Sequence, residues 1–183
     1  NSLPGTHNWQ NASAAAAAGH VLKISNDNIV SAITSYPGLA HRTENLGRVH
    51  DVTFINDSKA TNGEAAARAL ACYDNIFWIA GGRAKDDGLA FIKPFLPKIR
   101  HAFLIGEAAP EFEAELAGTV PVTQCNDLET ATTEAYRVAR ESRAKKATVL
   151  LSPACASFDQ WKNFESRGNA FKEFVSNLGK GEA

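Results

Sequence analysis

The sequence predicts a Rossmann-like α/β fold, with a doubly wound, mainly parallel sheet and helices on both faces. Three observations predict it. From about residue 49 onward, segments typical of strands alternate with segments typical of helices. The strands are short and almost wholly apolar, as in Asn75–Ala80 (NIFWIA), which is typical of parallel strands covered on both faces. The composition, 44% hydrophobic and 21% charged, is that of an ordinary globular protein.

The elements follow one another in a regular order. Strands are predicted at Val49–Asn56, Asn75–Ala80, Ala102–Ile105, Val120–Gln124 and Thr148–Leu151. Helices are predicted at Gly63–Tyr73, Phe91–Ile99, Pro110–Leu116, Leu128–Arg143 and Phe164–Leu178. Two prolines disturb the second of these helices. Right-handed crossovers between parallel strands then give the doubly wound arrangement.

The first 37 residues have a different character. Alanine content predicts a helix over Asn8–Leu22, and a second helix over Asn28–Tyr36 has Asp27 as its expected N-cap. Turn residues at Pro37-Gly38 then break the pattern. Two helices without a strand cannot form a domain, so we expect residues 1–37 to end a preceding domain and residues 38–183 to form the α/β domain. The chain contains no methionine, so we expect it to begin inside a longer protein.

Charge and composition exclude several classes of protein. With 19 basic and 20 acidic residues, the net charge of -1 argues against a nucleic-acid binder and against adhesion to a membrane surface. No apolar run approaches the roughly 18 residues of a membrane span, and no secretory signal opens the chain. The three cysteines form no pair typical of zinc sites or disulfides, which favours a reducing cytosol. The five histidines lack ligand spacing, so no metal site is expected.

Polar side chains follow three of the predicted strands at their carboxyl ends, where parallel α/β sheets bind ligands. The loops are NDSKATN (56–62), GGRAK (81–85) and SPACASFD (152–159). Together they place five polar residues along one edge of the sheet: Asp57, Lys59, Thr61, Lys85 and Ser157. We call this edge with its three loops the rim.

The chemistry of the rim predicts recognition of an anion. Lys59 and Lys85 supply ammonium groups, hydroxyls come from Thr61 and Ser157, and helix N-termini add N–H groups with a positive dipole end. A small molecule with one or two carboxylates, or with a phosphate, fits these donors. Asp57 in the same place could accept a hydrogen bond from a ribose hydroxyl or bind a cationic group.

Purely structural alternatives stay open for each loop. Asp57 and Ser58 could cap the helix that starts near Asn62, and Gly81-Gly82 could simply form a tight turn. The aromatic residues Phe158, Trp161 and Phe164 recur at a spacing of three, which is typical of a stripe facing the core. The coincidence of three polar loops at strand ends favours a site.

Common catalytic motifs are absent. The sequence has no G-x-x-x-x-G-K-[ST] loop, so the chain cannot bind a nucleoside triphosphate in the P-loop manner by itself. It has no G-x-G-x-x-G, which argues against a dinucleotide-dependent dehydrogenase. It has no G-x-S-x-G elbow, which argues against an α/β-hydrolase.

Two groups of motifs resemble the Mur ligases. The first comprises HNWQN (7–11), GLAHR (38–42) and NDSKATN (56–62), and the second comprises LLSPACASFDQ (150–160) followed by NFESRG (163–168). Within this family they are most similar to the D-glutamate-adding (MurD) ligases. Other members usually show an Asp-x-x-Ala-His pattern where this chain has DSKATN. The resemblance covers nearly the whole chain.

The resemblance implies a role for each candidate residue. Four are assigned to ATP: Asn8, Asn11, Arg42 and Asp57. Five are assigned to D-glutamate: Thr61, Lys85, Ser157, Phe158 and Phe164. Lys59 is the catalytic candidate, close to the reacting groups. Phe164 thereby moves from the core stripe to the site, whereas Trp161 stays in the core.

The resemblance also implies an ATP- and Mg²⁺-dependent ligase of peptidoglycan synthesis in the cytoplasm. ATP would phosphorylate the alanyl carboxylate of UDP-N-acetylmuramoyl-L-alanine, and the amine of D-glutamate would then displace phosphate. The family's phosphate loop and magnesium ligands precede the region covered here. We therefore expect residues 1–37 to be the last helices of a central ATP-binding domain, and the chain alone to be inactive. The alternatives are a non-catalytic amino-acid or nucleotide-binding module, and a related Mur or folylpolyglutamate-type ligase with another substrate.

Overall fold

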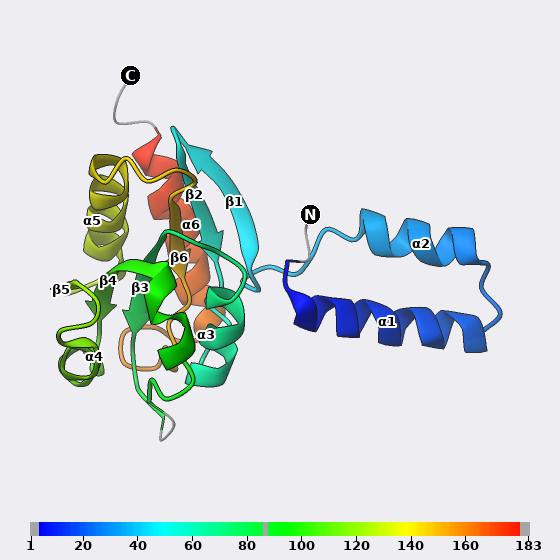
Figure 1. The fold of residues 1–183 in the computed structure, drawn as a ribbon, viewed down its shortest axis with the longest axis horizontal. Helices are drawn as coiled ribbons and strands as arrows, with labels where there is room; N and C mark the ends of the chain where they lie inside the picture. Colours follow the sequence, from blue (N-terminus) through cyan, green and yellow to red (C-terminus); the bar gives the residue numbers. More distant parts are fainter. Residues whose placement is uncertain (1–3, 86–87, 180–183) are drawn as a thin grey trace.

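A six-stranded sheet forms the centre of the α/β body in the computed structural model, which describes residues 4–85 and 88–179 (Figure 1). The strands are β1 (Glu44–Val49), β2 (Val52–Asn56), β3 (Ile76–Gly81), β4 (Ile99–Ile105), β5 (Val122–Gln124) and β6 (Thr148–Leu151). Their order is β1-β2-β6-β3-β4-β5, and only the β1–β2 pairing is antiparallel. The predicted fold class is confirmed.

Helices cover both faces of the sheet. One face carries α3 (Gly63–Leu70), the 3₁₀ helix η1 (Lys93–Lys98) and α4 (Ala109–Leu116); the other carries α5 (Leu128–Glu141) and α6 (Phe164–Leu178). Strand β3 shows why the sequence pattern is continuously apolar. Its Trp78 lies in the core under α3 and α4, whereas Phe77 and Ile79 lie in the core under α5 and α6.

Three local predictions were wrong. Residues 49–56 are not one strand, because a turn at His50 separates β2 from the unpredicted edge strand β1. Strand β1 is polar and only partly buried, and its pairing is irregular between Asn45 and Gly47, so it lacks the apolar signal. Around Pro97 the chain forms a 3₁₀ helix of six residues. The N-cap of the second helix is Ser25 rather than Asp27, since the Asn28 N–H faces the Ser25 hydroxyl at 3.4 Å.

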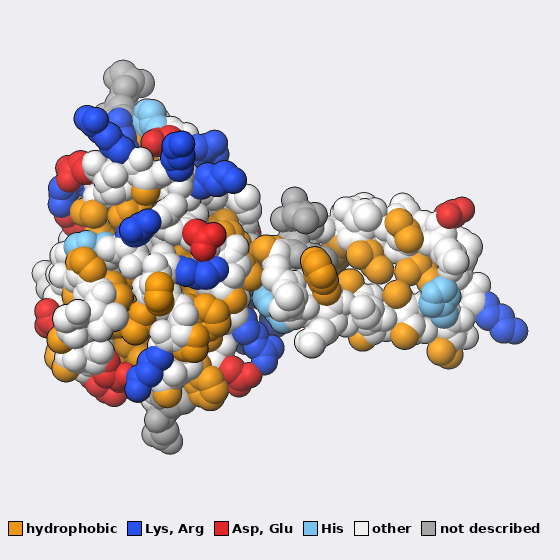
Figure 2. Space-filling view, viewed as in Figure 1, with side chains coloured by type: hydrophobic (Ala, Val, Ile, Leu, Met, Phe, Trp, Pro, Cys, Tyr) orange, Lys and Arg blue, Asp and Glu red, His pale blue; other side chains and the backbone are white. Residues whose placement is uncertain are grey.

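The first two helices form a hairpin beside the α/β body (Figure 1). They are α1 (Thr6–Val21) and α2 (Asn26–Ser35), and they approach closely where Gly19 faces the side chain of Ile29. Figure 2 shows apolar side chains exposed along this hairpin. Trp9 is 71% exposed and Val21 is 82% exposed. The hairpin therefore has an apolar surface that the described part of the chain leaves uncovered. Across the described part of the chain, none of the helices combines the length and apolar character of a membrane span.

The strand order fixes where a ligand site should lie. Strand β6 is inserted between β2 and β3, although it comes last in the sequence. The chain leaves β2 toward α3 on one face and leaves the adjacent β6 toward α6 on the other face. Such a divergence of neighbouring loops is the topological switch point at which open α/β sheets bind ligands. The rim predicted from the sequence surrounds this point.

Candidate functional site

Backbone hydrogen bonds join the loops that follow β3 and β6. The Gly81 N–H donates to the Pro153 carbonyl at 2.9 Å, and Arg83 and Ala156 exchange two bonds of 2.9 Å. Lys85 follows Arg83 by two residues, and Ser157 directly follows Ala156. The structure therefore brings the Lys85 and Ser157 loops together at one part of the rim. Lys85 is exposed, whereas Ser157 is buried.

The loop after β2 contacts the start of α6. The ammonium of Lys59 lies 4.1 Å from the ring centroid of Phe164, the first residue of that helix. The Ser58 hydroxyl donates to the Phe164 carbonyl at 2.8 Å. Phe164 at the start of α6 thus adjoins the part of the rim that carries Lys59 and Thr61.

Helix α3 follows this loop, and its N-cap is Asn62 rather than Asp57 or Ser58. The Asn62 side chain accepts a hydrogen bond from the Ala65 N–H at 2.8 Å and is the N-cap of α3. Capping of this helix by Asp57 or Ser58 is therefore wrong. Half-buried Thr61 directly precedes the cap, beside the positive end of the α3 dipole.

Asp57, directly after β2, connects the linker between α2 and β1 to the end of β6. Its Oδ1 accepts a hydrogen bond from the Thr43 N–H at 3.0 Å, and its Oδ2 accepts one from the Ser152 hydroxyl at 2.8 Å. Burial raises the pKa of Asp57 to about 7, although both hydrogen bonds and the charge of Arg42 oppose that shift. Because both oxygens are engaged, Asp57 has a clear structural role, while its contact with ATP stays a prediction.

This raised pKa predicts a pH-dependent stability. The ordinary value is 3.8, so the folded chain binds the Asp57 proton more tightly than the unfolded chain does. Stability should therefore fall as the pH rises from about 4 to about 7. Asp57→Asn cannot ionise, so its unfolding free energy relative to wild type should increase through this window and level off above it. Urea unfolding of both proteins at several pH values tests this, because other groups such as His41 cancel in the difference. A difference that is constant with pH would contradict the prediction.

His41, two residues before Thr43 in the same linker, packs against Gly168 of α6. Its side chain is buried, and the Asn56 amide lies 3.0 Å from His41 Nδ1 and 3.1 Å from the Gly168 carbonyl. A side chain at Gly168 would collide with the imidazole of His41, so this slot requires glycine. Burial, reinforced by the charge of Lys172, lowers the pKa of His41. Arg42, between His41 and Thr43, is exposed, and its charge acts on Asp57.

The remaining candidates differ in position. Asn8 and Asn11 lie on α1, in the hairpin beside the α/β body, so the structure does not bring them to the rim. The Asn8 amide donates to the Pro4 carbonyl at 2.7 Å. Phe158 is 63% exposed, so the prediction of a core-facing stripe is wrong at this residue. Trp161 is half-buried and packs against the core under α5 and α6.

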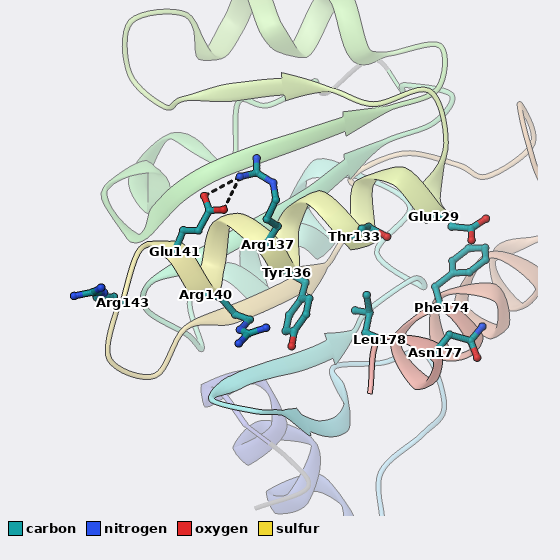
Figure 3. A pocket seen from close by; sticks show the side chains of 10 residues that line it. All are labelled: Glu129, Thr133, Tyr136, Arg137, Arg140, Glu141, Arg143, Phe174, Asn177 and Leu178. Carbon is teal, nitrogen blue, oxygen red and sulfur yellow. Dashed lines mark hydrogen bonds and ion pairs between the residues drawn. The ribbon is translucent and has the colours of Figure 1, made fainter. Parts of the chain in front are cut away.

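A groove of about 810 Å³ lies elsewhere, between α5 and α6 (Figure 3). None of its lining residues is a candidate site residue. Arg137 in its wall is paired with Glu134 at 2.8 Å and with Glu141 at 2.7 Å. Arg140 lies over the ring of Tyr136 at 5.5 Å. Because these charges are satisfied on the helix surface, we assign the groove no role in the site.

Four residues of the site region were not predicted: His41, Thr43, Ser152 and Arg167. Each is buried or contacts the rim through backbone atoms, which leaves no periodic signal in the sequence. The available signal was local, since Arg167-Gly168 closes the NFESRG motif. In residues 4–85 and 88–179, no group of three or more His, Cys, Asp or Glu side chains gathers in the manner of a metal site.

The geometry defines an α/β domain that presents cationic and hydroxyl groups at the switch point of its sheet. Comparison with known proteins agrees. The family model described as "Mur ligase, glutamate ligase domain" matches residues 41–155. The chain therefore belongs to the Mur ligase family.

Curated relatives carry the name UDP-N-acetylmuramoylalanine--D-glutamate ligase. The protein of Rhodospirillum rubrum is 51% identical over 176 residues, covering 96% of this chain and 37% of the relative. The protein of Paramagnetospirillum magneticum is 49% identical over 182 residues, covering 100% of this chain and 40% of the relative. The protein of Rhizobium meliloti is 52% identical, covering 96% and 38%. The chain thus spans about two fifths of the length of these relatives.

A solved structure shows the same fold at low sequence identity. The bifunctional folylpolyglutamate synthase/dihydrofolate synthase from Yersinia pestis superimposes with a TM-score of 0.53. The match has 16% identity and covers 82% of this chain and 34% of that protein. This likeness supports the α/β architecture alone.

Proposed function

We propose that this chain is the amino-acid-binding part of an ATP-dependent ligase that joins D-glutamate to UDP-N-acetylmuramoyl-L-alanine in the cytoplasm. The name of the relatives supports this proposal, as does their identity of about one half over nearly the whole chain. The motifs of the rim support it independently, because DSKATN and SPACASFD are similar to those of D-glutamate-adding ligases.

The observation that carries the proposal is the convergence of the three rim loops. They bear Lys59, Thr61, Lys85 and Ser157, and they are linked by the Arg83–Ala156 backbone pair and by the hydrogen bond from the Ser152 hydroxyl to Asp57. A dicarboxylic amino acid needs donors at both of its negative ends, and its amine must be aimed at the acyl carbon. Thr61, Lys85, Ser157, Phe158 and Phe164 would orient D-glutamate in this way.

The proposed chemistry is amide formation through an acyl phosphate. ATP transfers its terminal phosphoryl group to the alanyl carboxylate and leaves as ADP. The amine of D-glutamate then attacks the acyl carbon, phosphate leaves with the electrons of the C–O bond, and the nitrogen releases a proton to water. The ammonium of Lys59 would stabilise negative charge that develops at the reacting atoms. Mg²⁺ is expected with ATP in such a reaction, but the described residues do not gather ligands for it.

We also propose that residues 1–37 complete an ATP-binding domain and that residues 38–183 form the amino-acid-binding domain. The uncovered apolar surface of the α1–α2 hairpin supports this division, because such a surface normally packs against protein. Asn8 and Asn11 on α1 would contact the adenine, and Arg42 and Asp57 the rest of the nucleotide.

The test uses the full-length protein that we propose contains this chain. With ATP, Mg²⁺, UDP-N-acetylmuramoyl-L-alanine and D-glutamate it should release phosphate, and omission of any one should abolish release. The 183-residue chain alone should release none above background. Turnover that prefers another amino acid would indicate a related ligase. Binding without turnover in the full-length protein would indicate a non-catalytic module, and either result would contradict the proposal.

A further inference from the structure

Arg167 is a buried cation beneath the rim, and the proposed function gives it no role. It projects from the first turns of α6 and is 1% exposed. Its Nε donates to the Ser58 hydroxyl at 3.0 Å, and its Nη2 donates to the carbonyls of Ser58 at 2.9 Å and Cys155 at 3.1 Å. Burial lowers the pKa of Arg167 to about 10, which still leaves the guanidinium charged at neutral pH.

The partners of Arg167 are all neutral. Within residues 4–85 and 88–179 no carboxylate forms an ion pair with it, and its buried Nη1 has no hydrogen-bond partner. The charges of Cys155 and Asp159 act on Arg167 from nearby, but Asp159 Oδ2 accepts its hydrogen bond from the Glu107 N–H at 3.2 Å rather than from Arg167. A buried charge without a counter-ion costs folding free energy, so stability alone does not account for this arginine.

The guanidinium of Arg167 donates hydrogen bonds to two of the rim loops and lies beside the third. Ser58 precedes Lys59, and Cys155 comes two residues before Ser157. The third loop is reached at Gly82, where an added Cβ would lie 3.2 Å from Nη1 and would also collide with the Ala156 carbonyl. Gly82 comes three residues before Lys85. The planar fork of Arg167 thus lies where the three chain segments that carry the candidate residues meet.

We propose that Arg167 is a positioning residue for the acidic amino acid, because its buried guanidinium holds the three loops bearing Lys59, Lys85 and Ser157 in one arrangement. This inference rests on the proposed function. The positive charge beneath the rim forms no ion pair within residues 4–85 and 88–179, so it also favours an anionic ligand above it. A lysine at this position would keep the charge but could not make the three divergent bonds of the fork. Arg167→Lys therefore separates the effect of the hydrogen-bond geometry of Arg167 from the effect of its charge.

The experiment measures phosphate release by the full-length protein as D-glutamate and ATP are varied separately. Arg167→Lys should raise the KM for D-glutamate about tenfold and leave the KM for ATP within about twofold, since the residues assigned to adenine do not contact Arg167. Ser58→Ala removes one acceptor of the fork and should raise the same KM by a smaller factor. Arg137→Lys is the matched control, an exposed arginine on α5 whose replacement should change neither KM.

The outcomes separate this inference from the proposed function. A wild-type protein without D-glutamate-dependent phosphate release contradicts the proposed function before any variant is measured. An active wild type with an unchanged KM for D-glutamate in Arg167→Lys overturns the inference alone. Equal increases in both KM values would also overturn it, since they indicate general loss of structure. If Arg167→Lys does not fold, Ser58→Ala is judged by the same criteria.

Discussion

Replacing Lys59 with alanine in the full-length protein should lower the kcat of D-glutamate-dependent phosphate release about 10²- to 10³-fold, the usual effect of removing one charge-stabilising donor. Lys59 leaves β2 at the switch point, and its ammonium is placed 4.1 Å from the ring centroid of Phe164. The ammonium therefore lies between the loop after β2 and the start of α6, where we propose that it acts on the reacting atoms of the ligand. Steady-state phosphate release measures the effect.

Lys93→Ala is the control for this prediction, because Lys93 is exposed on η1 and belongs to none of the three loops of the rim. Its kcat should match that of the wild type. Lys59→Arg keeps the positive charge and should retain more activity than Lys59→Ala. A kcat for Lys59→Ala within about threefold of wild type would show that the ammonium does not act on the reacting atoms.

Gly81→Ala should destabilise the chain by at least about 3 kcal/mol, because two separate costs add. Gly81 has a φ of +120°, which side-chain-bearing residues rarely adopt, and an added Cβ would overlap the carbonyl oxygen of Ile105 at the end of β4. Neither strand can move away, since the Gly82 N–H donates to that same carbonyl at 3.0 Å. The substitution should therefore distort the loop that leads from Gly81 to Lys85.

The matched control is Gly118→Ala, at a φ of +74° with nothing within 4 Å of the added Cβ. It should cost only about 1 kcal/mol, the backbone term without the collision. Urea unfolding of the 183-residue chain compares the two variants. Equal destabilisation would mean that the collision at the Ile105 carbonyl is relieved without cost.

The sequence predicted the central strands and the helices that cover them because their signal is local. Strand β6 and helix α6 have the predicted bounds, since a continuous apolar run and an amphipathic segment capped by Asn163 define them. Edge strand β1 has no comparable signal. Its residues become a strand only through pairing with β2, a tertiary contact that composition does not encode.

The candidate site was predictable to the level of the rim and no further. Strand ends follow from the fold, so Lys59, Thr61, Lys85 and Ser157 could be assigned to one edge. The burial of Asp57 between Thr43 and Ser152 could not be predicted, because it depends on how the linker folds back. Arg167 lies 109 residues from Ser58 in sequence, and its role depends on the packing of α6.

The central claim is that the rim clasps D-glutamate, and the KM for D-glutamate tests it most directly. The variants Lys85→Ala and Ser157→Ala are measured in the full-length protein, with Ser176→Ala on the exposed side of α6 as the control. The account predicts that each rim variant raises the KM for D-glutamate about tenfold or more, with the KM for ATP within about twofold of wild type. An unchanged KM for D-glutamate in both variants would contradict it.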